Sequence, residues 1–271
     1  TLKLTANNDK ISLSDIQIYV NKIVDNYENL KNDELKKKLY IFQYEGSDDK
    51  CSNVFQMYPF KTTCTLDKLY FDNKNEILNQ IDFFINNKLW YEERGKPYTL
   101  GICCYGLPGC GKTSFEKGLA KKLNRHIIII DLSKVKSQRD ADYIFFSEKL
   151  NNKKIPYNKR LYIFPDFDST TDIIQKRNDK TILSNSGFLK KEDINDFLKK
   201  NNKFDSFDKG PSVPLNLSKF LNILDGIPER TGQVIMMDTN LINKIDDALL
   251  RPGRIDCLIE FKKINKTNTI L

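Results

Sequence analysis

Eight consecutive residues constrain the fold of this chain more than any other feature: Gly106-Leu107-Pro108-Gly109-Cys110-Gly111-Lys112-Thr113. They fit the pattern G-x-x-x-x-G-K-[ST], and they lie between an apolar run and a helical pattern over 113–123. The glycines let the backbone curl so that successive N–H groups point inward at phosphate oxygens, and the helix that follows aims its positive end at the same anion. Because the strand, loop and helix come in the required order, the pattern predicts a phosphate-binding loop rather than a chance match.

The residue types in this loop indicate which ligand it takes. Lys112 offers a point charge to the β- and γ-phosphates of a nucleotide, and the hydroxyl of Thr113 is a ligand for Mg²⁺. Ser114 follows at the first turn of the helix and is included in the predicted site. The sequence therefore predicts that ATP and Mg²⁺ bind here.

Strands and helices alternate around this loop. The predicted strands are short, continuous apolar runs, as expected of parallel strands covered on both faces: Ile102–Tyr105, Ile127–Ile130, Leu161–Phe164, Val234–Met237 and Cys257–Phe261. Helical patterns over 113–123 and 217–224 separate some of them. The fold class is thus α/β, a doubly wound sheet of five parallel strands.

The remaining segments divide the chain into regions. Residues 1–65 are expected to form a small separate α+β module, with a helix over 13–30 and strands over 38–44 and 53–58. Residues 66–98 are interpreted as a linker containing an amphipathic helix over 72–90. The core would span 99–265, with a polar surface insertion over 169–214 that holds one helix near 191–199, and a tail over 266–271.

Cysteine usage favours a reducing compartment, with the cytoplasm expected. The chain has six cysteines and no CxxC pair, so zinc-ligand spacing is absent from the sequence. Cys103, Cys104 and Cys110 fall on a strand or the phosphate loop, where small packing residues are favoured over a redox role for Cys110. No apolar run reaches the roughly 18–20 residues needed to cross a bilayer, and no signal peptide opens the sequence.

The formal net charge of +8 raises the question of nucleic acid binding. The lysines are spread along the chain, and Lys36–Lys38 and Lys199–Lys200 fit polar helical faces. A solvated surface is therefore favoured over a nucleic-acid partner, and the abundance of Lys, Asn and Ile resembles translation of an A/T-rich genome.

Three segments together carry a family resemblance. They are Trp90–Tyr98 before the first core strand, Leu221-Asn222-Ile223-Leu224-Asp225-Gly226, and Asp247-Ala248-Leu249-Leu250-Arg251-Pro252-Gly253-Arg254-Ile255-Asp256. With the phosphate loop, they resemble the AAA branch of AAA+ ATPases that contains the mitochondrial Rieske-protein translocase, a chaperone for cytochrome bc complex assembly. Soluble relatives of that branch occur in giant viruses and plants. The resemblance spans roughly residues 66–262.

The resemblance implies roles for three further residues. Asn240 follows the strand Val234–Met237 at the first sensor position, where its amide would orient water or contact the γ-phosphate. Arg251 and Arg254 match the paired arginines that reach the nucleotide of a neighbouring subunit and neutralise charge on the transferred phosphoryl group. The alternative for these arginines is an ion pair with Asp246, Asp247 or Asp256. The family role requires a ring-shaped oligomer of the chain with itself.

One motif of the family is incomplete. Two adjacent acids, one residue and an aspartate should follow the third strand, and here the sequence reads Pro165-Asp166-Phe167-Asp168. Asp166 falls at the water-activating position, while Pro165 replaces the acid on the metal side and offers no ligand. Three readings stay open: slow hydrolysis with Asp166 and Thr113 serving the metal, ATP binding with little turnover, or Asp166 on the metal with another acid activating water.

Other departures concern the ends of the core. Few residues follow the last strand, so a complete C-terminal helical lid with its second sensor is not expected. The segment 132–137 lacks the aromatic-apolar-glycine pattern of threading unfoldases. The single histidine, His126, has no metal-spaced companion, and a structural role is expected.

These observations support three hypotheses for function. The first is an ATP-driven ring that remodels or translocates a protein substrate. The second is a nucleotide-gated scaffold with little hydrolysis, motivated by Pro165. The third, a nucleic-acid motor, rests on net charge alone and is the least favoured.

Overall fold

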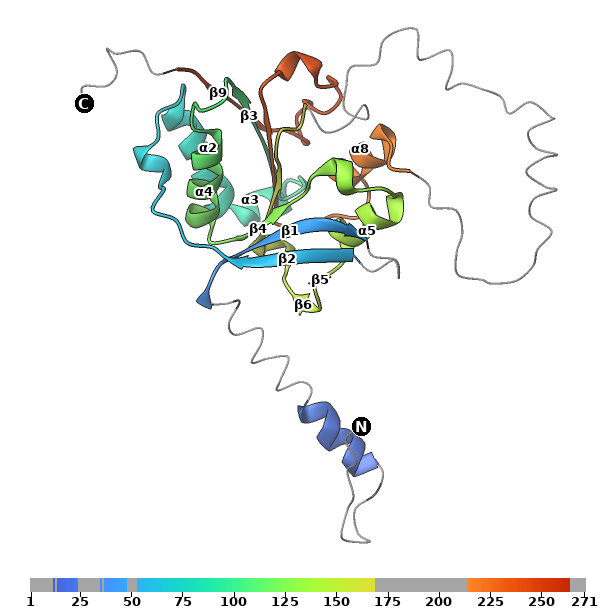
Figure 1. Ribbon diagram of the computed structural model, residues 1–271. Helices are drawn as coiled ribbons and strands as arrows, with labels where there is room; N and C mark the ends of the chain where they lie inside the picture. The colour runs from blue at the N-terminus through green and yellow to red at the C-terminus, as the bar shows by residue number, and fades with distance from the viewer. Residues whose placement is uncertain are drawn as a thin grey trace, which may run out of the picture.

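A computed structural model describes residues 12, 14–23, 35, 37–47, 53–168 and 214–263 of the chain. Figure 1 shows a twisted sheet with helices packed on both of its faces. The seven strands of this sheet are β1 (Tyr40–Ser47), β2 (Asn53–Pro59), β3 (Thr99–Gly106), β4 (His126–Ile129), β7 (Arg160–Phe164), β8 (Gln233–Thr239) and β9 (Cys257–Phe261).

The five predicted core strands are confirmed. They lie in the order β4-β7-β8-β3-β9, and each neighbouring pair is parallel. The strand that enters the phosphate loop, β3, lies between β8 and β9. This order brings the carboxyl ends of β7 and β8 to the same edge of the sheet as the loop, because parallel strands end together.

The N-terminal hairpin differs from the expectation of a separate module. Strands were predicted over 38–44 and 53–58, and β1 and β2 occupy these positions, but β1 pairs in parallel with β4. The sheet therefore has seven strands, with β2 antiparallel at its edge. The physical reason is that β1 pairs the backbone groups of β4 on the side away from β7, while its own alternate aromatic residues join the core.

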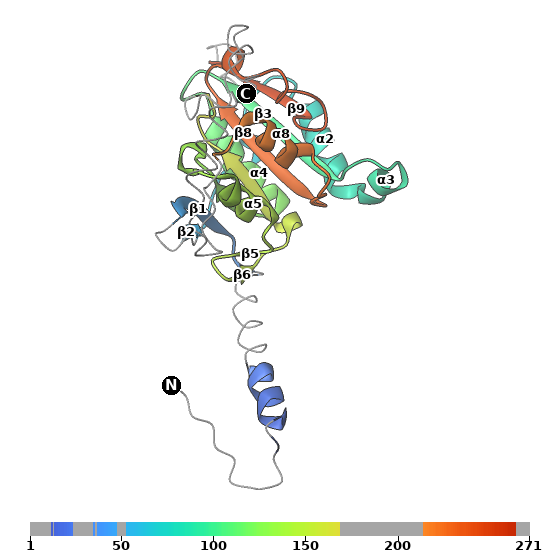
Figure 2. The same cartoon turned by 90° about the vertical axis from the view of Figure 1, so that its right-hand side faces the viewer.

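Two helical layers cover the sheet, as Figures 1 and 2 show. Helices α2 (Lys74–Asn86) and α4 (Lys112–Leu123) bury Ile81 and Phe115 against one face, in a cluster with Leu161, Ile163, Val234 and Met236. Helices α5 (Gln138–Phe146) and α8 (Leu217–Asp225) bury side chains against the other, in a cluster with Tyr162, Phe164, Ile235 and Met237. Successive strand residues thus alternate between the two cores.

The remaining elements are short. The helix predicted over 72–90 divides at Asn87 into α2 and α3 (Lys88–Glu93). A two-stranded ribbon comprises β5 (Lys149–Leu150) and β6 (Lys153–Lys154). Single turns of 3-10 helix lie at η1 (Leu66–Lys68), η2 (Leu132–Lys134), η3 (Tyr157–Lys159) and η4 (Ile242–Lys244). Residues 14–23 are helical, within the helix predicted over 13–30.

The turn between β5 and β6 contacts the outer edge of β2. The backbone N–H of Phe55 donates to the side-chain oxygen of Asn151 at 3.2 Å, and the Asn151 side-chain nitrogen donates to the carbonyl of Phe55. Asn151 has a φ of 47°, in the left-handed region that asparagine tolerates. A side chain thus occupies backbone groups of the edge strand.

Some expectations fall on residues outside this description. The insertion over 169–214, with its helix near 191–199, lies outside it except for Pro214, and so do the tail and residues 264–265. Among the described helices, none combines the length and apolar character that a membrane crossing needs.

Candidate active site

The loop between β3 and α4 has the backbone shape that its glycines predict. Gly106 has a φ of 137°, and a Cβ atom there would lie 2.1 Å from the carbonyl oxygen of Phe261, at the end of β9. Gly111, at a φ of 106°, is the N-cap of α4. Both positions exclude a larger residue, since an L-amino acid rarely adopts such a φ. The loop therefore presents its backbone at the positive end of α4.

Lys112 is the first residue of α4 and lies buried beneath the loop. Its Nζ donates to the carbonyl oxygen of Gly106 at 2.8 Å and to that of Leu107 at 3.3 Å. A third hydrogen bond, 2.6 Å long, runs to the side-chain oxygen of Asn240. The lysine thus joins the phosphate loop to the end of β8. Thr113 is exposed and Ser114 is half-buried on the same turn.

The structure brings Asp166 to this lysine through Asn240. The side-chain nitrogen of Asn240 lies 3.4 Å from the Oδ1 of Asp166, which is exposed just past β7. Asp166 has a φ of 43°, so its backbone leaves the strand direction there. The predicted residues Lys112, Asn240 and Asp166 therefore form one connected polar group at the carboxyl edge of the sheet.

Asp168 has a different position from Asp166. Its Oδ1 accepts a 2.6 Å hydrogen bond from the Thr239 hydroxyl and a 3.0 Å hydrogen bond from the backbone N–H of Asn240. Partial burial alone would raise the pKa of Asp168, but these hydrogen bonds outweigh it and lower the pKa below its usual value. The carboxylate fixes the backbone of Asn240, so it orients this residue at the end of β8.

Two buried acids near Lys112 were missed by the sequence reasoning. Asp238 lies within β8, and its Oδ1 accepts a 2.7 Å hydrogen bond from the backbone N–H of Asp166. Glu116 lies on the buried face of α4. Burial, with the charge of Asp238, raises the pKa of Glu116 to about 8, and burial also raises the pKa of Asp238. The available signal was an acid at an otherwise apolar strand position, Val234-Ile235-Met236-Met237-Asp238.

Arg251 and Arg254 lie away from the loop of their own chain. The backbone of Arg254 packs against Gly101, where a Cβ atom would meet the Arg254 carbonyl oxygen at 1.7 Å. Gly101 and Gly106 are five residues apart on β3, which corresponds to roughly 16 Å. The guanidinium of Arg254 pairs with Asp225 at 2.7 Å and also donates to the Ala248 carbonyl. The observed carboxylate partner of Arg254 is Asp225, an acid outside the alternatives expected from the sequence. Arg251 is exposed.

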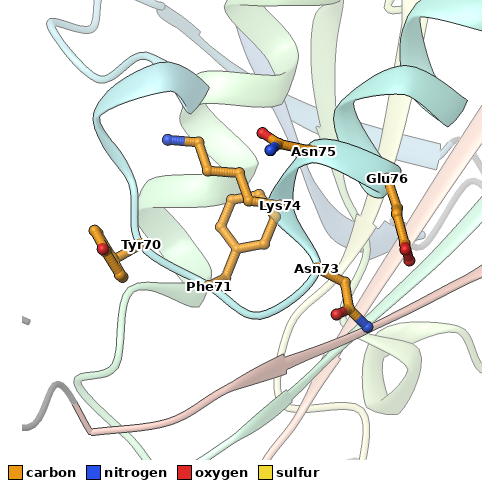
Figure 3. A pocket seen from close by; sticks show the side chains of 6 residues that line it. All are labelled: Tyr70, Phe71, Asn73, Lys74, Asn75 and Glu76. Atoms are coloured by element: carbon orange, nitrogen blue, oxygen red, sulfur yellow. The ribbon is translucent and has the colours of Figure 1, made fainter.

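A hollow of about 540 Å³ opens beside the phosphate loop, between η1 and α2. Figure 3 shows the side chains that line it, with the ring of Phe71 turned toward α4. That ring lies 5.3 Å from the ring of Phe115 on α4 and 5.7 Å from that of Phe261. A Cβ atom at Gly111 would lie 3.8 Å from Phe261. The hollow and the phosphate loop are thus neighbours that share one aromatic cluster.

His126 and the described cysteines lie outside this group. The Nδ1 of His126 accepts a 3.1 Å hydrogen bond from the backbone N–H of Tyr40, and burial lowers its pKa to about 4. This agrees with the structural role expected for His126. The five described cysteines are free thiols, and burial raises the pKa of Cys103 and Cys257 to about 12. Among the described residues, no group of histidine, cysteine or acidic side chains has the arrangement of a protein-only metal site.

The donor set fits a Mg²⁺-nucleotide. The loop supplies backbone N–H groups and a buried lysine for phosphate oxygens, and Thr113, Asp166 and Asp238 supply oxygen atoms for a hard cation. A parallel sheet, a phosphate loop after β3 and polar residues at the ends of β7 and β8 together define a P-loop nucleotide-binding protein.

The comparison with known families makes the class specific. Residues 102–263 match the model of the ATPase family associated with various cellular activities (AAA). The chain belongs to this family.

Curated relatives agree with that membership. The chain is 30% identical over 239 residues to the probable mitochondrial chaperone BCS1-A of Dictyostelium discoideum, which covers 88% of the chain and 48% of the relative. It is 29% identical to the Arabidopsis thaliana protein AAA-ATPase At3g28610, covering 89% of the chain and 48% of the relative. The human mitochondrial chaperone BCS1 is 29% identical over 67% of the chain and 36% of its own length. The chain spans about half the length, or less, of these relatives. The resemblance stated from the motifs is thereby confirmed.

Proposed function

We propose that this protein hydrolyses ATP, as a ring of identical subunits, to remodel or translocate a protein substrate. The observation that carries the proposal is the 2.6 Å hydrogen bond between Lys112 and Asn240, with Asp166 within 3.4 Å of the same amide. It connects the residue that binds phosphate with the residue that responds to it and an acid that can polarise water. The names of the curated relatives, mitochondrial chaperones among them, support a protein as the substrate class.

Each residue has a defined part in this proposal. The loop backbone and Lys112 bind and orient the phosphates, while Asn240 positions the attacking water and Asp166 accepts a proton from it. Mg²⁺ neutralises charge on the phosphate oxygens when it is bound with the nucleotide. Asp168 keeps Asn240 in place through the backbone hydrogen bond described above.

The base of the nucleotide is proposed to lie in the hollow next to the loop. Tyr70 and Phe71 provide aromatic surface there, and Asn73 and Asn75 provide amides that can donate and accept hydrogen bonds. Tyr70 is 54% exposed, so its ring is available for stacking.

Assembly into a ring is supported by the position of the two arginines. Neither lies at its own phosphate loop, and Asp225 holds the guanidinium of Arg254 on the surface formed by α8 and the segment before β9. These side chains would therefore contact the nucleotide bound to a neighbouring subunit. Arg251, which is exposed, is the better placed of the two to reach across an interface.

A nucleotide-gated scaffold is the second candidate, and Pro165 favours it. In that case ATP binding would stabilise one conformation of the protein or its assembly, and the metal-side acid would be lacking for turnover. The two candidates share the binding site and differ in the chemical step.

Phosphate release from Mg·ATP by the purified chain separates them, with Lys112→Ala and Pro165→Asp measured alongside. Turnover in the original protein that Lys112→Ala abolishes supports the ATPase. Binding without turnover, together with turnover in Pro165→Asp, supports the scaffold. No binding in the original protein contradicts both candidates.

A further inference from the structure

The strand next to Pro165, β8, places an acid beside it. Strands β7 and β8 pair in parallel, and the last described pair of the register is Phe164 with Met237. The next step along both strands brings Pro165 opposite Asp238. The backbone confirms this closeness, because the N–H of Asp166 donates to Asp238 Oδ1 at 2.7 Å. Asp238 therefore lies next to Pro165, the residue that replaces the metal-side acid of the family motif.

Both residues belong to the face of the sheet that carries the phosphate loop. Ile163 and Met236 pack in the cluster beneath α2 and α4, and strand side chains return to the same face every second residue. Asp238 therefore faces α4, and it pairs with Cys104, two residues before Gly106. The Asp238 carboxylate therefore lies on the same sheet face as the loop and α4, in contact with the backbone of Asp166.

The surroundings of Asp238 are those of a ligand-binding carboxylate. It is only 7% exposed, and the described residues offer no ion pair within 4 Å to compensate the buried charge. The Asp238 carboxylate interacts electrostatically with the positive charge of Lys112 and with the negative charges of Asp166 and Asp168. Glu116 lies on the adjoining face of α4, also buried. Ionising several acids around such a buried carboxylate is costly unless a cation joins them.

We propose that Asp238 takes the metal-side role that Pro165 leaves unfilled, so that the acid pair of this nucleotide site is Asp238 on β8 and Asp166 after β7. The proposal rests on the proposed function, since it concerns how the same site binds Mg²⁺. Asp238 holds the water shell of Mg²⁺, and Asp166 polarises the attacking water. The catalytic acids are then divided between two neighbouring strands.

Binding of ATPγS with Mg²⁺ and with EDTA tests this assignment without relying on turnover. The variant is Asp238→Asn, which keeps a side-chain oxygen for the N–H of Asp166 and removes the charge. We expect the gain in nucleotide affinity produced by Mg²⁺ to fall by about 10- to 100-fold. Nucleotide affinity measured in EDTA is expected not to fall, because the substitution removes a negative charge that would repel the phosphates.

Two further variants make the result specific. Asp131→Asn removes a carboxylate that follows β4 and caps η2, and it controls for the change in net charge. In this variant Mg²⁺ should raise nucleotide affinity as much as it does in the original protein. The double variant Pro165→Asp, Asp238→Asn returns one carboxylate to the facing position on β7. We expect it to recover most of the Mg²⁺ gain.

An unchanged Mg²⁺ gain in Asp238→Asn overturns the assignment, provided that thermal unfolding shows the variant to be folded. If Asp238→Asn is unstable, the double variant decides: a stable double variant without recovered Mg²⁺ dependence also overturns it. The proposed function is judged separately by Lys112→Ala. Nucleotide binding lost in Lys112→Ala while Asp238→Asn behaves as the original leaves the proposed function standing and removes this inference alone.

Discussion

The ammonium group of Lys112 and the side-chain oxygen of Asn240 lie 2.6 Å apart, although the two residues are separated by 128 positions in the chain. The contact joins the start of α4 to the end of β8, so the phosphate loop and the sensor position are one unit. Under the proposed function, a change in the phosphate bound by Lys112 would alter the hydrogen bonding of Asn240 directly.

Replacing Asn240 with alanine tests this link. We expect nucleotide affinity to change by less than about tenfold, since Lys112 keeps its two carbonyl partners. Turnover should fall by about 10²- to 10³-fold, as found when a positioned donor is removed from a reacting centre. Asn243→Ala, an exposed amide three residues further on, is the matched control in the phosphate-release assay. Equal turnover in both variants contradicts the role of Asn240.

If Arg251 acts on the nucleotide of a neighbouring subunit, two inactive variants should restore each other's turnover when mixed. Arg251→Ala subunits retain a nucleotide site, and Lys112→Ala subunits retain the arginine. We expect each variant alone to lose turnover by about 10³-fold or more, and a mixture to regain part of it, because some interfaces then combine an intact loop with an intact arginine. Mixing the two at varied ratios measures this. A mixture that stays inactive under conditions where the subunits co-assemble rules against action across the interface.

The hollow beside the loop predicts selectivity for the nucleotide base. Tyr70→Ala should weaken ATP binding by about tenfold, in line with a stacking contribution of about 1–3 kcal/mol. Binding of inorganic tripolyphosphate should not change, since that ligand has no base. Tyr58→Ala, which removes an exposed tyrosine from β2, is the control. Equal losses for both ligands would place the effect on the loop instead of the base.

His126 predicts a dependence of stability on pH. Its pKa falls from 6.5 to about 4 in the folded chain, because burial and nearby Lys159 oppose its charge. The unfolded chain therefore binds the proton more readily between these values, and stability is complete above pH 6.5 and falls as pH drops toward 4. The loss from this group is up to about 3 kcal/mol.

Urea unfolding of the original protein and of His126→Asn between pH 4 and 7.5 measures that contribution. Asparagine retains an acceptor for the N–H of Tyr40 and does not titrate in this range. The difference in stability between the two proteins should shrink or reverse as pH falls through 6.5 toward 4. Since His126 is the only histidine of the chain, no second imidazole complicates the comparison.

The core of the fold could be predicted because its signals are local. Each core strand is a short apolar run, and the loop pattern fixes which strand precedes α4, so the five parallel strands follow from adjacent residues. The addition of β1 could not be predicted in this way. Ile41 pairs with Ile127 across 86 positions, and the choice of that partner depends on the free edge of β4, which only the assembled sheet defines.

The site was predictable to a similar extent. Lys112 follows from the loop pattern, and the family motifs mark Asp166 and Asn240 at the ends of two predicted strands. No motif marks Asp238 or Glu116, and a single acid in or beside an apolar segment does not tell which face it lies on or what it contacts. The division of the predicted linker helix at Asn87 also lacks a proline or glycine to announce it.

The contact between Asn151 and Phe55 has a consequence for the life of the chain in a crowded solution. The outermost strand of a sheet is a template on which a second molecule can add a strand and start an aggregate. Here a single amide imitates one residue of such a strand and occupies the N–H and carbonyl of Phe55. A second molecule therefore cannot pair with the edge of β2 at Phe55 while this contact is in place. The contact requires Asn151 to adopt a left-handed backbone conformation.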